Sequence, residues 1–233
     1  MPATVLLATD NPGRCDALRE SLDTLGLSVT VAETGAEILQ LHDRLSPRLI
    51  LLATDIPDIH AFDVCRRLRR DSDVPVIVIG DNPSDFDSIL ALELGADDFI
   101  ARDCMYEEVN ERIRAALRRG AGMRLGEEAG DSLDFGEIVI DRRAHRMIVR
   151  GEVQELTPTE LDLIWALAEN AGEVISSDDL LASVWGYPEG IRTRTLDVHV
   201  SRLRRKLGER GRNARHIITV RGIGYRFEPH PTE

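Results

Sequence analysis

The sequence predicts an α/β domain built on a five-stranded, parallel, doubly wound sheet, followed by a smaller α+β domain. Two observations lead to this fold class. In the first half, short apolar runs alternate five times with stretches of helical periodicity, which is the pattern of repeated strand–helix units. From about residue 132 the pattern changes to several short strands with turns, then helices, then a terminal hairpin.

The elements of the first half follow from these runs. We expect strands at residues 4–8, 28–32, 48–53, 75–80 and 97–101, and helices at 11–25, 34–46, 60–71, 84–94 and 106–119. The first, third and fourth strands are apolar throughout, as parallel strands are when helices cover both faces of their sheet. Because such sheets bind ligands beyond the carboxyl ends of their strands, we expect a site around Thr9–Asn11, Ala53–Asp55 and Gly80–Asn82.

The segment "GAGMRLGEEAGDS" at 120–132 separates the two halves. It is rich in Gly, Ala and charge and has few large side chains, which is typical of a linker. We therefore divide the chain into a first domain at 1–120, a linker at 121–131 and a second domain at 132–233.

The second domain begins with short strands over 133–156. Thr157, with Pro158 next and Glu160 three residues on, predicts a capped helix. A second helix starts after Ser176, and a third is expected at about 194–207. The segment 216–227 predicts a hairpin that turns at Gly222–Gly224. A sheet, three helices and a hairpin make a winged helix-turn-helix.

Charge is distributed unevenly along the chain. The formal net charge is −12, yet residues 192–226 hold 11 basic residues against only Asp197 and Glu209. A block this basic in an acidic protein favours a local surface for a polyanion. All but one of the basic residues of the chain are arginines, the exception being Lys206.

The third helix of the second domain carries most of this charge. Its leucines and valine at 196, 200, 203 and 207 have helical spacing and are expected to face the core. The outer surface then carries Arg194, Thr195, His199, Arg202, Arg204 and Arg205. Such a helix fits the major groove of DNA, where arginine can bond guanine bidentately and other cations meet phosphates. Arg221, in the hairpin turn, suits a backbone or minor-groove contact, so we predict double-stranded DNA as the partner.

The quoted motifs also resemble a known family. "LTPTELDLIWAL", "RTRTLDVHVSRLRRKLG" and "RHIITVRGIGYRFEP" are similar to the DNA-binding domain of OmpR/PhoB-family response regulators. "TVLLATDNP", "RLILLATDIPD" and "LELGADDFIARD" resemble the receiver domain of that family. The resemblance implies a sequence-specific transcriptional regulator that binds direct repeats near promoters. It also implies that Arg202 reads bases and that the loop around Tyr187–Arg192 can touch RNA polymerase.

The resemblance to a receiver domain does not extend to the residues that would take part in phosphoryl transfer. The phospho-acceptor aspartate corresponds to Ala53, the pair of Mg²⁺-binding acids to Thr9 and Asp10, the hydroxyl residue to Gly80 and the lysine to Arg102. Alanine offers no nucleophile, and one carboxylate is a poor Mg²⁺ site. A planar guanidinium does not reproduce a lysine ammonium. We therefore predict an atypical, degenerate receiver that works without phosphorylation, with no metal and no cofactor.

Several alternatives stay open. Asp55, two residues beyond Ala53, could serve as a displaced acceptor in a conventional phosphorelay. The emptied pocket could admit an unknown small molecule or contact a partner, or the protein could be constitutively competent with its abundance setting its activity. The chain could also be an adaptor that binds only proteins.

The resemblance further implies a homodimer. Receivers of the family pair through positions that correspond to Asp97, Asp98, Glu108, Arg112 and Arg114. We expect Asp98 to reach Arg112 and Asp97 to reach Arg114, without any need for phosphate. Exposed ion pairs are worth only about 0–1 kcal/mol each, so they would set the register of the dimer more than its affinity.

The sequence lacks the signals that are typical of several other classes of protein. Cys15, Cys65 and Cys104 are odd in number and show no CxxC spacing, so we expect neither structural disulfides nor a zinc site. We find no glycine-rich phosphate loop and no nucleophile–base pair, so we do not predict an enzyme. No apolar run approaches the ~20 residues that span a bilayer, and the start lacks the basic region of a signal peptide. We expect a cytoplasmic protein without membrane contact.

Overall fold

The computed structural model describes residues 4–9, 12–81, 85–120, 131–209 and 214–230. Contacts divide the chain into two compact units, one made mainly of residues 1–122 and the other mainly of residues 123–233. The predicted linker at 121–131 lies, except for Asp131, outside the described residues. Across the described ranges, no helix is both long enough and apolar enough to cross a membrane.

The first unit is a five-stranded parallel sheet in the order β2-β1-β3-β4-β5. Its strands are β1 (Thr4–Ala8), β2 (Ser28–Ala32), β3 (Leu49–Ala53), β4 (Val76–Gly80) and β5 (Asp98–Ala101). Its helices are α1 (Pro12–Thr24), α2 (Gly35–Leu45), α3 (Ala61–Leu68), α4 (Asp85–Glu93) and α5 (Tyr106–Gly120). The predicted α/β class and the alternating element order are confirmed.

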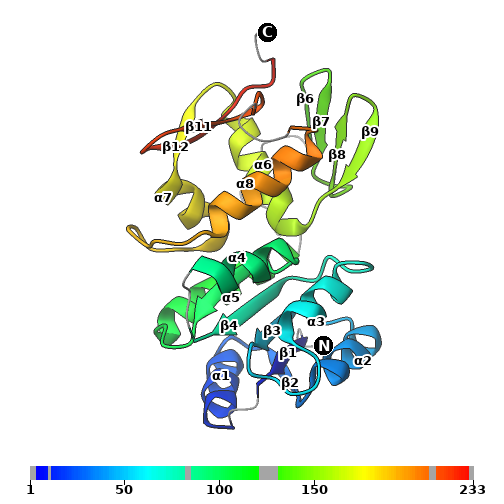
Figure 1. Cartoon of the computed structure of the whole chain (residues 1–233), viewed down its shortest axis with the longest axis vertical. Helices are drawn as coiled ribbons and strands as arrows, with labels where there is room; N and C mark the ends of the chain where they lie inside the picture. The colour runs from blue at the N-terminus through cyan, green and yellow to red at the C-terminus, as the bar shows by residue number, and fades with distance from the viewer. Residues whose placement is uncertain (1–3, 10–11, 82–84, 121–130, 210–213, 231–233) are drawn as a thin grey trace. The chain divides into compact units, whose positions relative to one another are not determined.

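Both faces of this sheet are covered, as the apolar strands predict (Figure 1). On one face, Leu18 of α1 and Val109 and Ile113 of α5 form a buried cluster with the strands. On the other face, alternate strand residues such as Leu6 and Ile50 are fully buried. Helices α2, α3 and α4 cover that face and contact one another in chain order. A doubly wound sheet of this kind leaves its carboxyl strand ends free of helices, so they are available for a site.

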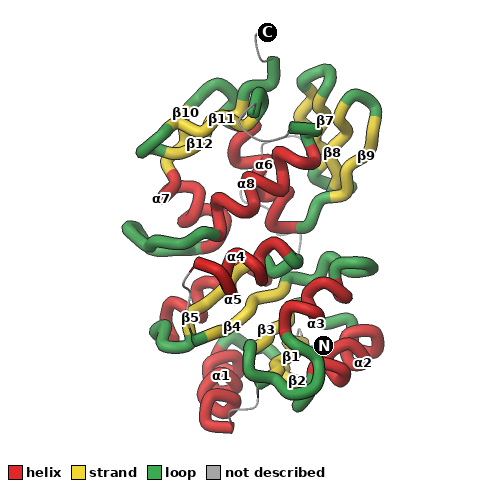
Figure 2. The backbone as a smooth tube through the Cα atoms, viewed as in Figure 1, coloured by secondary structure: helices red, strands yellow, loops and turns green. Residues whose placement is uncertain are grey.

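The second unit begins with an antiparallel sheet in the order β6-β7-β8-β9. Its strands are β6 (Ser132–Asp134), β7 (Ile138–Asp141), β8 (Arg146–Val149) and β9 (Glu152–Glu155). Next come α6 (Pro158–Glu169), β10 (Val174–Ser176), α7 (Ser177–Leu180), a π-helical turn η1 (Leu181–Trp185), α8 (Thr195–Lys206), β11 (Ile217–Val220) and β12 (Gly224–Phe227). Figure 2 shows these helices between two separate groups of strands. The predicted winged helix-turn-helix is confirmed.

Strand β10 is an addition to the predicted hairpin. It pairs with β12, so the wing is a three-stranded sheet in the order β10-β12-β11. With only three residues it is too short to show periodicity in the sequence, and it ends at the Ser176 cap of α7. The Ser176 hydroxyl accepts a hydrogen bond from the backbone N–H of Asp179 at 3.0 Å, as the sequence predicts for a helix start. The wing is thereby connected directly to the start of the second helix.

Candidate functional site

Helix α8 has one buried and one exposed side. The side chains at 196, 200, 203 and 207 are buried in the core of the second unit, as predicted. Arg205 and Ser201 are exposed, and Arg202 is half-buried. Arg194, just before the helix, and Arg221, in the turn between β11 and β12, are also exposed. The described part of the helix therefore presents arginines outward, at the positions for which we predict DNA contacts.

Arg204 makes contacts within the domain that were not predicted. Its Nε donates a hydrogen bond to the carbonyl oxygen of Ile217 at 2.9 Å, and its Nη2 donates to Oγ1 of Thr219 at 2.8 Å. The guanidinium also lies 5.9 Å from the centre of the Tyr225 ring. These contacts join α8 to the wing, which the sequence analysis missed. The DNA contact that we assigned to Arg204 stays a prediction.

A second contact joins α8 to the wing. The hydroxyl of Tyr225 on β12 donates a hydrogen bond to Oδ1 of Asp197 at 2.7 Å. Burial, and then the carboxylate of Asp197, raise the pKa of the Tyr225 hydroxyl, so it is protonated and can donate at neutral pH. Helix α8 is thus bonded to two of the three strands of the wing, β11 and β12.

Arg204→Ala should lower the free energy of unfolding of the second unit by about 1–3 kcal/mol, because carbonyl and hydroxyl acceptors lose a charged donor. Both tryptophans of the chain, Trp165 and Trp185, lie in this unit, so urea unfolding followed by tryptophan fluorescence reports on it within the full-length protein. Arg205→Ala removes an exposed arginine from the next position and should lower the free energy of unfolding far less than Arg204→Ala does. Equal stability of the two variants would contradict the bracing role of Arg204.

Two other predicted DNA contacts have partners within the domain. The ring of His199 packs edge-on against the Trp185 ring, with their centres 5.2 Å apart. Oγ1 of Thr193 accepts a hydrogen bond from the backbone N–H of Thr195 at 3.1 Å, and the two hydroxyls lie 2.8 Å apart. His199 is 0% exposed, so the expectation that it lies on the outer surface of the helix is wrong: its ring packs into the core beside Trp185. The contacts of both residues with DNA stay predictions.

Lys206, the one lysine of the chain, ties α8 to the start of α6. Its Nζ donates to Oε2 of Glu160 at 2.6 Å, and the same oxygen accepts the backbone N–H of Thr157 at 3.1 Å in the predicted capping box. Burial alone would raise the pKa of Glu160. The charge and hydrogen bond of Lys206, aided by Arg202 and Thr157, outweigh burial and hold that pKa below its usual value.

Four of the five predicted receiver positions lie at one edge of the parallel sheet, where neighbouring strands end. Thr9 follows β1, Ala53 ends β3, Gly80 ends β4 and Arg102 follows β5. The fifth, Asp10, lies outside the described residues. Ala53 is 1% exposed and presents only a methyl group at the position where the family resemblance implies a nucleophile.

Arg102 is engaged by two acids of the same edge. Its guanidinium forms ion pairs with Asp55, beyond β3, and with Asp81, beyond β4. Asp55 is the residue considered as a displaced phosphoryl acceptor, and its carboxylate is here the counter-ion of an arginine. Asp81 lies within Gly80–Asn82, where a site is expected from the sequence, but its pairing with Arg102 was not predicted.

The ring of Phe99 occupies the space that a side chain at position 80 would need, which favours glycine there. A Cβ atom at position 80 would lie 2.5 Å from Cζ of Phe99 and 3.2 Å from Cγ2 of Thr54. Phe99 is buried, so its ring fills the space above β4 that a side chain would need. A hydroxyl residue therefore cannot be accommodated at position 80 unless the ring moves.

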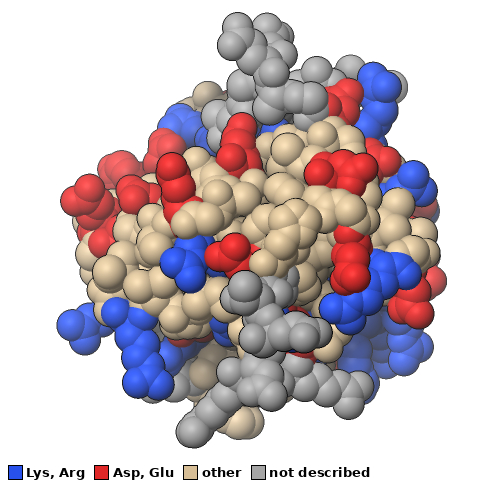
Figure 3. Space-filling view, turned by 90° about the horizontal axis from the view of Figure 1, so that it is seen from above, with Lys and Arg blue, Asp and Glu red and all other residues tan. Residues whose placement is uncertain are grey.

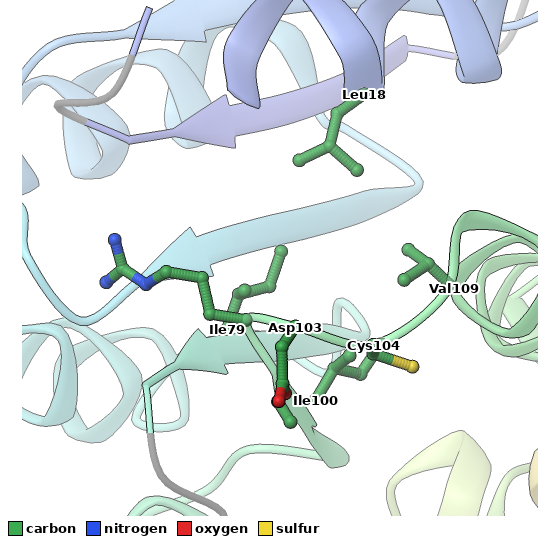
Figure 4. A pocket seen from close by; sticks show the side chains of 8 residues that line it. Leu18, Ile79, Ile100, Asp103, Cys104 and Val109 are labelled. Carbon is green, nitrogen blue, oxygen red and sulfur yellow. The ribbon is translucent and has the colours of Figure 1, made fainter. Parts of the chain in front are cut away.

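A cavity of about 210 Å³ lies beside this edge. Leu18 from α1 and Val109 from α5 face each other across it, with Ile79 and Ile100 at the sheet (Figure 4). Cys104 lines the same cavity. Burial, with a hydrogen bond to Glu108, raises the pKa of its thiol to about 12, so the thiol is protonated and a weak nucleophile at neutral pH.

The acids and arginines predicted for a dimer surface have partners inside one chain. Asp97 accepts the backbone N–H of Val76 at 2.8 Å and forms an ion pair with Arg69, whereas the sequence analysis paired it with Arg114 of a second copy. Arg114 forms an ion pair with Glu111.

The remaining predicted dimer residues form one group. Nη1 of Arg112 lies 3.7 Å from Oδ2 of Asp98. Nη2 of Arg112 also forms an ion pair with Glu108, one helical turn away. The ion pair of Asp98 with Arg112 is therefore found within a single chain. The role of these residues in a dimer stays a prediction.

Comparison with known proteins shows which family each unit matches. Residues 5–114 match the family described as "Response regulator receiver domain", and residues 151–227 match "Transcriptional regulatory protein, C terminal". The "DNA-binding response regulator MtrA" of Mycolicibacterium smegmatis is 37% identical over 229 residues, which cover 98% of each chain. The "Transcriptional regulatory protein AfsQ1" of Streptomyces coelicolor is 38% identical, covering 98% of this chain and 99% of that one. The chain belongs to the OmpR/PhoB family of response regulators.

Solved structures of similar proteins agree with this assignment. DrrB of Thermotoga maritima, an OmpR/PhoB homologue, is 27% identical with a TM-score of 0.51 and covers 98% of this chain and 100% of its own. A mutant of RitR is 25% identical with a TM-score of 0.72, covering 97% of this chain and 99% of its own. As a response regulator with this effector domain, the protein is a DNA-binding regulator of transcription of the two-component type.

Proposed function

We propose that this response regulator binds specific promoter sequences in the cytoplasm and that its receiver acts without aspartyl phosphorylation. The observation that carries the second part is the methyl group of Ala53 at the end of β3. Phosphoryl transfer to a protein needs a nucleophile, and the side chain of alanine has none.

The surroundings of Ala53 support the same proposal. Arg102 is paired with Asp55 and Asp81, so its charge is already balanced by carboxylates. Phosphorylation of Asp55 would have to break its ion pair with Arg102 and place a second negative charge beside Asp81. The ring of Phe99 leaves no room at Gly80 for the hydroxyl that would bond a phosphoryl oxygen.

The DNA-binding part is tested by Arg205→Ala, which removes an exposed arginine of α8. We expect affinity for an operator selected from genomic DNA to fall by about 10- to 100-fold, with a smaller salt dependence, because a phosphate or base contact is lost. Fluorescence anisotropy titrations at several salt concentrations measure both. Arg143→Ala, an exposed arginine between β7 and β8, is the control and should bind like the wild type. If no genomic DNA is bound by the wild type, the adaptor alternative is favoured instead.

Dimerisation and the control of activity are the other two parts of the proposed function. A homodimer on direct repeats would form without phosphate, and sedimentation of the untreated protein as a monomer, at concentrations that saturate the operator, would count against it. Activity would follow either the abundance of the protein or a small molecule or partner bound at the emptied pocket around Thr9, Ala53 and Gly80. Thermal-shift screening with metabolites, read together with operator affinity, distinguishes these two modes.

A further inference from the structure

We propose that the first unit binds a small, uncharged molecule, about the size of one aromatic ring with a short polar substituent, in the cavity between α1 and α5. This is the cavity of about 210 Å³ across which Leu18 and Val109 face each other (Figure 4). None of Thr9, Ala53 and Gly80 lines it, so the site is separate from the emptied pocket of the proposed function. Binding here requires neither DNA nor a phosphoryl group.

The cavity interrupts an otherwise closely packed core. In the same cluster of side chains, Leu7, Leu22 and Ile77 are fully buried. Protein interiors contain few spaces larger than a water molecule. This space remains because Ala101 and Cys104, which line it, have small side chains. An apolar residue of the size of leucine at either position would fill much of the space, so the sequence leaves room for a ligand.

The inner wall of the cavity is apolar. Leu18, Ile79, Ile100 and Val109 line it, and each is 6% exposed or less. An apolar protein cavity of about 150 Å³ is large enough to bind benzene. The volume of about 210 Å³ therefore accommodates one ring with a short substituent. It lies below the roughly 300 Å³ at which pockets for larger ligands begin.

The outer end of the cavity is polar and reaches solvent. Arg102, Asp103 and Cys104 line it. Asp103 is exposed, and the other two residues are partly exposed. A ligand that enters from this end places its ring against the apolar wall and keeps its polar substituent in contact with water.

The charges around the cavity favour an uncharged ligand. The guanidinium of Arg102 is paired with Asp55 and Asp81, and Asp103 adds a further carboxylate. The Cys104 thiol, whose pKa burial raises to about 12, is neutral at pH 7. The chain has a net charge of −12, and carboxylates lie at several places on the face shown in Figure 3, so anions are repelled at long range. Burial of an unpaired charge of either sign against the apolar wall is costly.

Three compounds with the same ring test this assignment. Benzyl alcohol is uncharged, whereas benzoate is an anion and benzylamine is a cation at pH 7. In full-length protein labelled with ¹³C at the isoleucine δ1 methyl groups, Ile79→Val and Ile100→Val assign the two signals of the cavity. Benzyl alcohol should shift both signals saturably through its ring current, with a Kd on the order of 1 mM or below. Benzoate and benzylamine should bind more weakly by about tenfold or more.

Substitutions at one position test where the ligand lies. Val109→Phe should place a ring of the protein itself in the cavity and abolish the shifts, whereas Val109→Ala enlarges the cavity and should retain binding. Leu25→Phe adds a ring at a partly buried position of the same cluster but outside the cavity, and it should bind like the wild type. If Val109→Phe fails to fold, Cys104→Leu fills the cavity from its partly exposed end.

The outcomes are distinct. Signals of Ile79 and Ile100 that do not shift saturably with benzyl alcohol would overturn the site. Benzoate or benzylamine binding as tightly as benzyl alcohol would overturn the class of ligand, and equal shifts in Val109→Phe and Val109→Ala would overturn the location. The signals of Ile138 and Ile140, which are buried in the second unit, should stay in place throughout. These titrations contain no DNA, so a failure of the proposed function appears only in the operator measurements.

Discussion

Gly224→Ala should lower the free energy of unfolding of the second unit by about 3 kcal/mol or more and abolish operator binding. A Cβ atom at this position would lie 2.0 Å from the carbonyl oxygen of Ile175 and 2.8 Å from the backbone nitrogen of Ser177. Both are backbone atoms, and neither can move aside freely. Gly224 is paired with Ser176 on one side and with Val220 on the other, so the whole wing would have to separate.

Gly222→Ala is the control for this prediction. Gly222 lies in the turn just before β12 with φ +76°, and among the described residues beyond its chain neighbours no atom lies within 4 Å of the place that a Cβ would take. Alanine there adds only the strain of a left-handed backbone, about 1–2 kcal/mol. Urea unfolding followed by tryptophan fluorescence should therefore rank the wild type above Gly222→Ala, and Gly222→Ala well above Gly224→Ala. Equal destabilisation by the two substitutions would show that the close approach of β10 does not exclude a side chain at position 224.

Lys206→Met should lower the free energy of unfolding of the same unit by about 3 kcal/mol at pH 7. Truncating one partner of a buried ion pair leaves the other charge uncompensated, which typically costs about 3–5 kcal/mol. Here the carboxylate left behind is Glu160, whose side chain is 4% exposed, while Lys206 retains some contact with water. The backbone N–H of Thr157 still bonds Glu160, which keeps the expected cost at the lower end of that range.

The loss of stability in Lys206→Met should depend on pH, in a direction that the pKa of Glu160 determines. The pKa of Glu160 is lowered in the folded protein, so its pair with Lys206 contributes stability above the unfolded pKa, about 4.3, and loses it as the pH falls through the folded value. In Lys206→Met, burial acts without the lysine and the pKa of Glu160 should rise. The difference in unfolding free energy between wild type and variant is therefore largest near pH 7 and shrinks toward acid pH.

Lys206→Arg retains a positive charge at the same place and should recover most of the lost stability. Taking the difference between variants at each pH cancels the contribution of the other carboxylates of the chain. A difference that grows as the pH falls would contradict the assigned sign and the role of Lys206.

The fold could be predicted because its signals are local. Apolar runs of five or six residues, helix caps such as Thr157 with Glu160, and the turn at Gly222–Gly224 each specify structure within a few positions. Strand β10 was not predicted, because three residues show no period and its pairing with β12 joins segments about 50 positions apart in the chain.

The sites could be predicted only in part. Helical spacing separates the buried side of α8 from the rest, but it does not distinguish the flank that faces the wing from the side that can face DNA. For that reason the bonds of Arg204 to Ile217 and Thr219 were not predicted. The identity of Ala53 was readable from the sequence, whereas the pairing of Arg102 with Asp55 and Asp81 depends on strand order.

The central claim, a regulator that binds DNA without a phosphorylated receiver, is tested most directly by one paired measurement. The intact mass of the protein and its Kd for the operator are determined before and after incubation with acetyl phosphate. With Ala53 at the end of β3, we expect neither the mass nor the Kd to change. A phosphoryl group on Asp55 or another residue of the first unit, accompanied by tighter operator binding, would contradict the account.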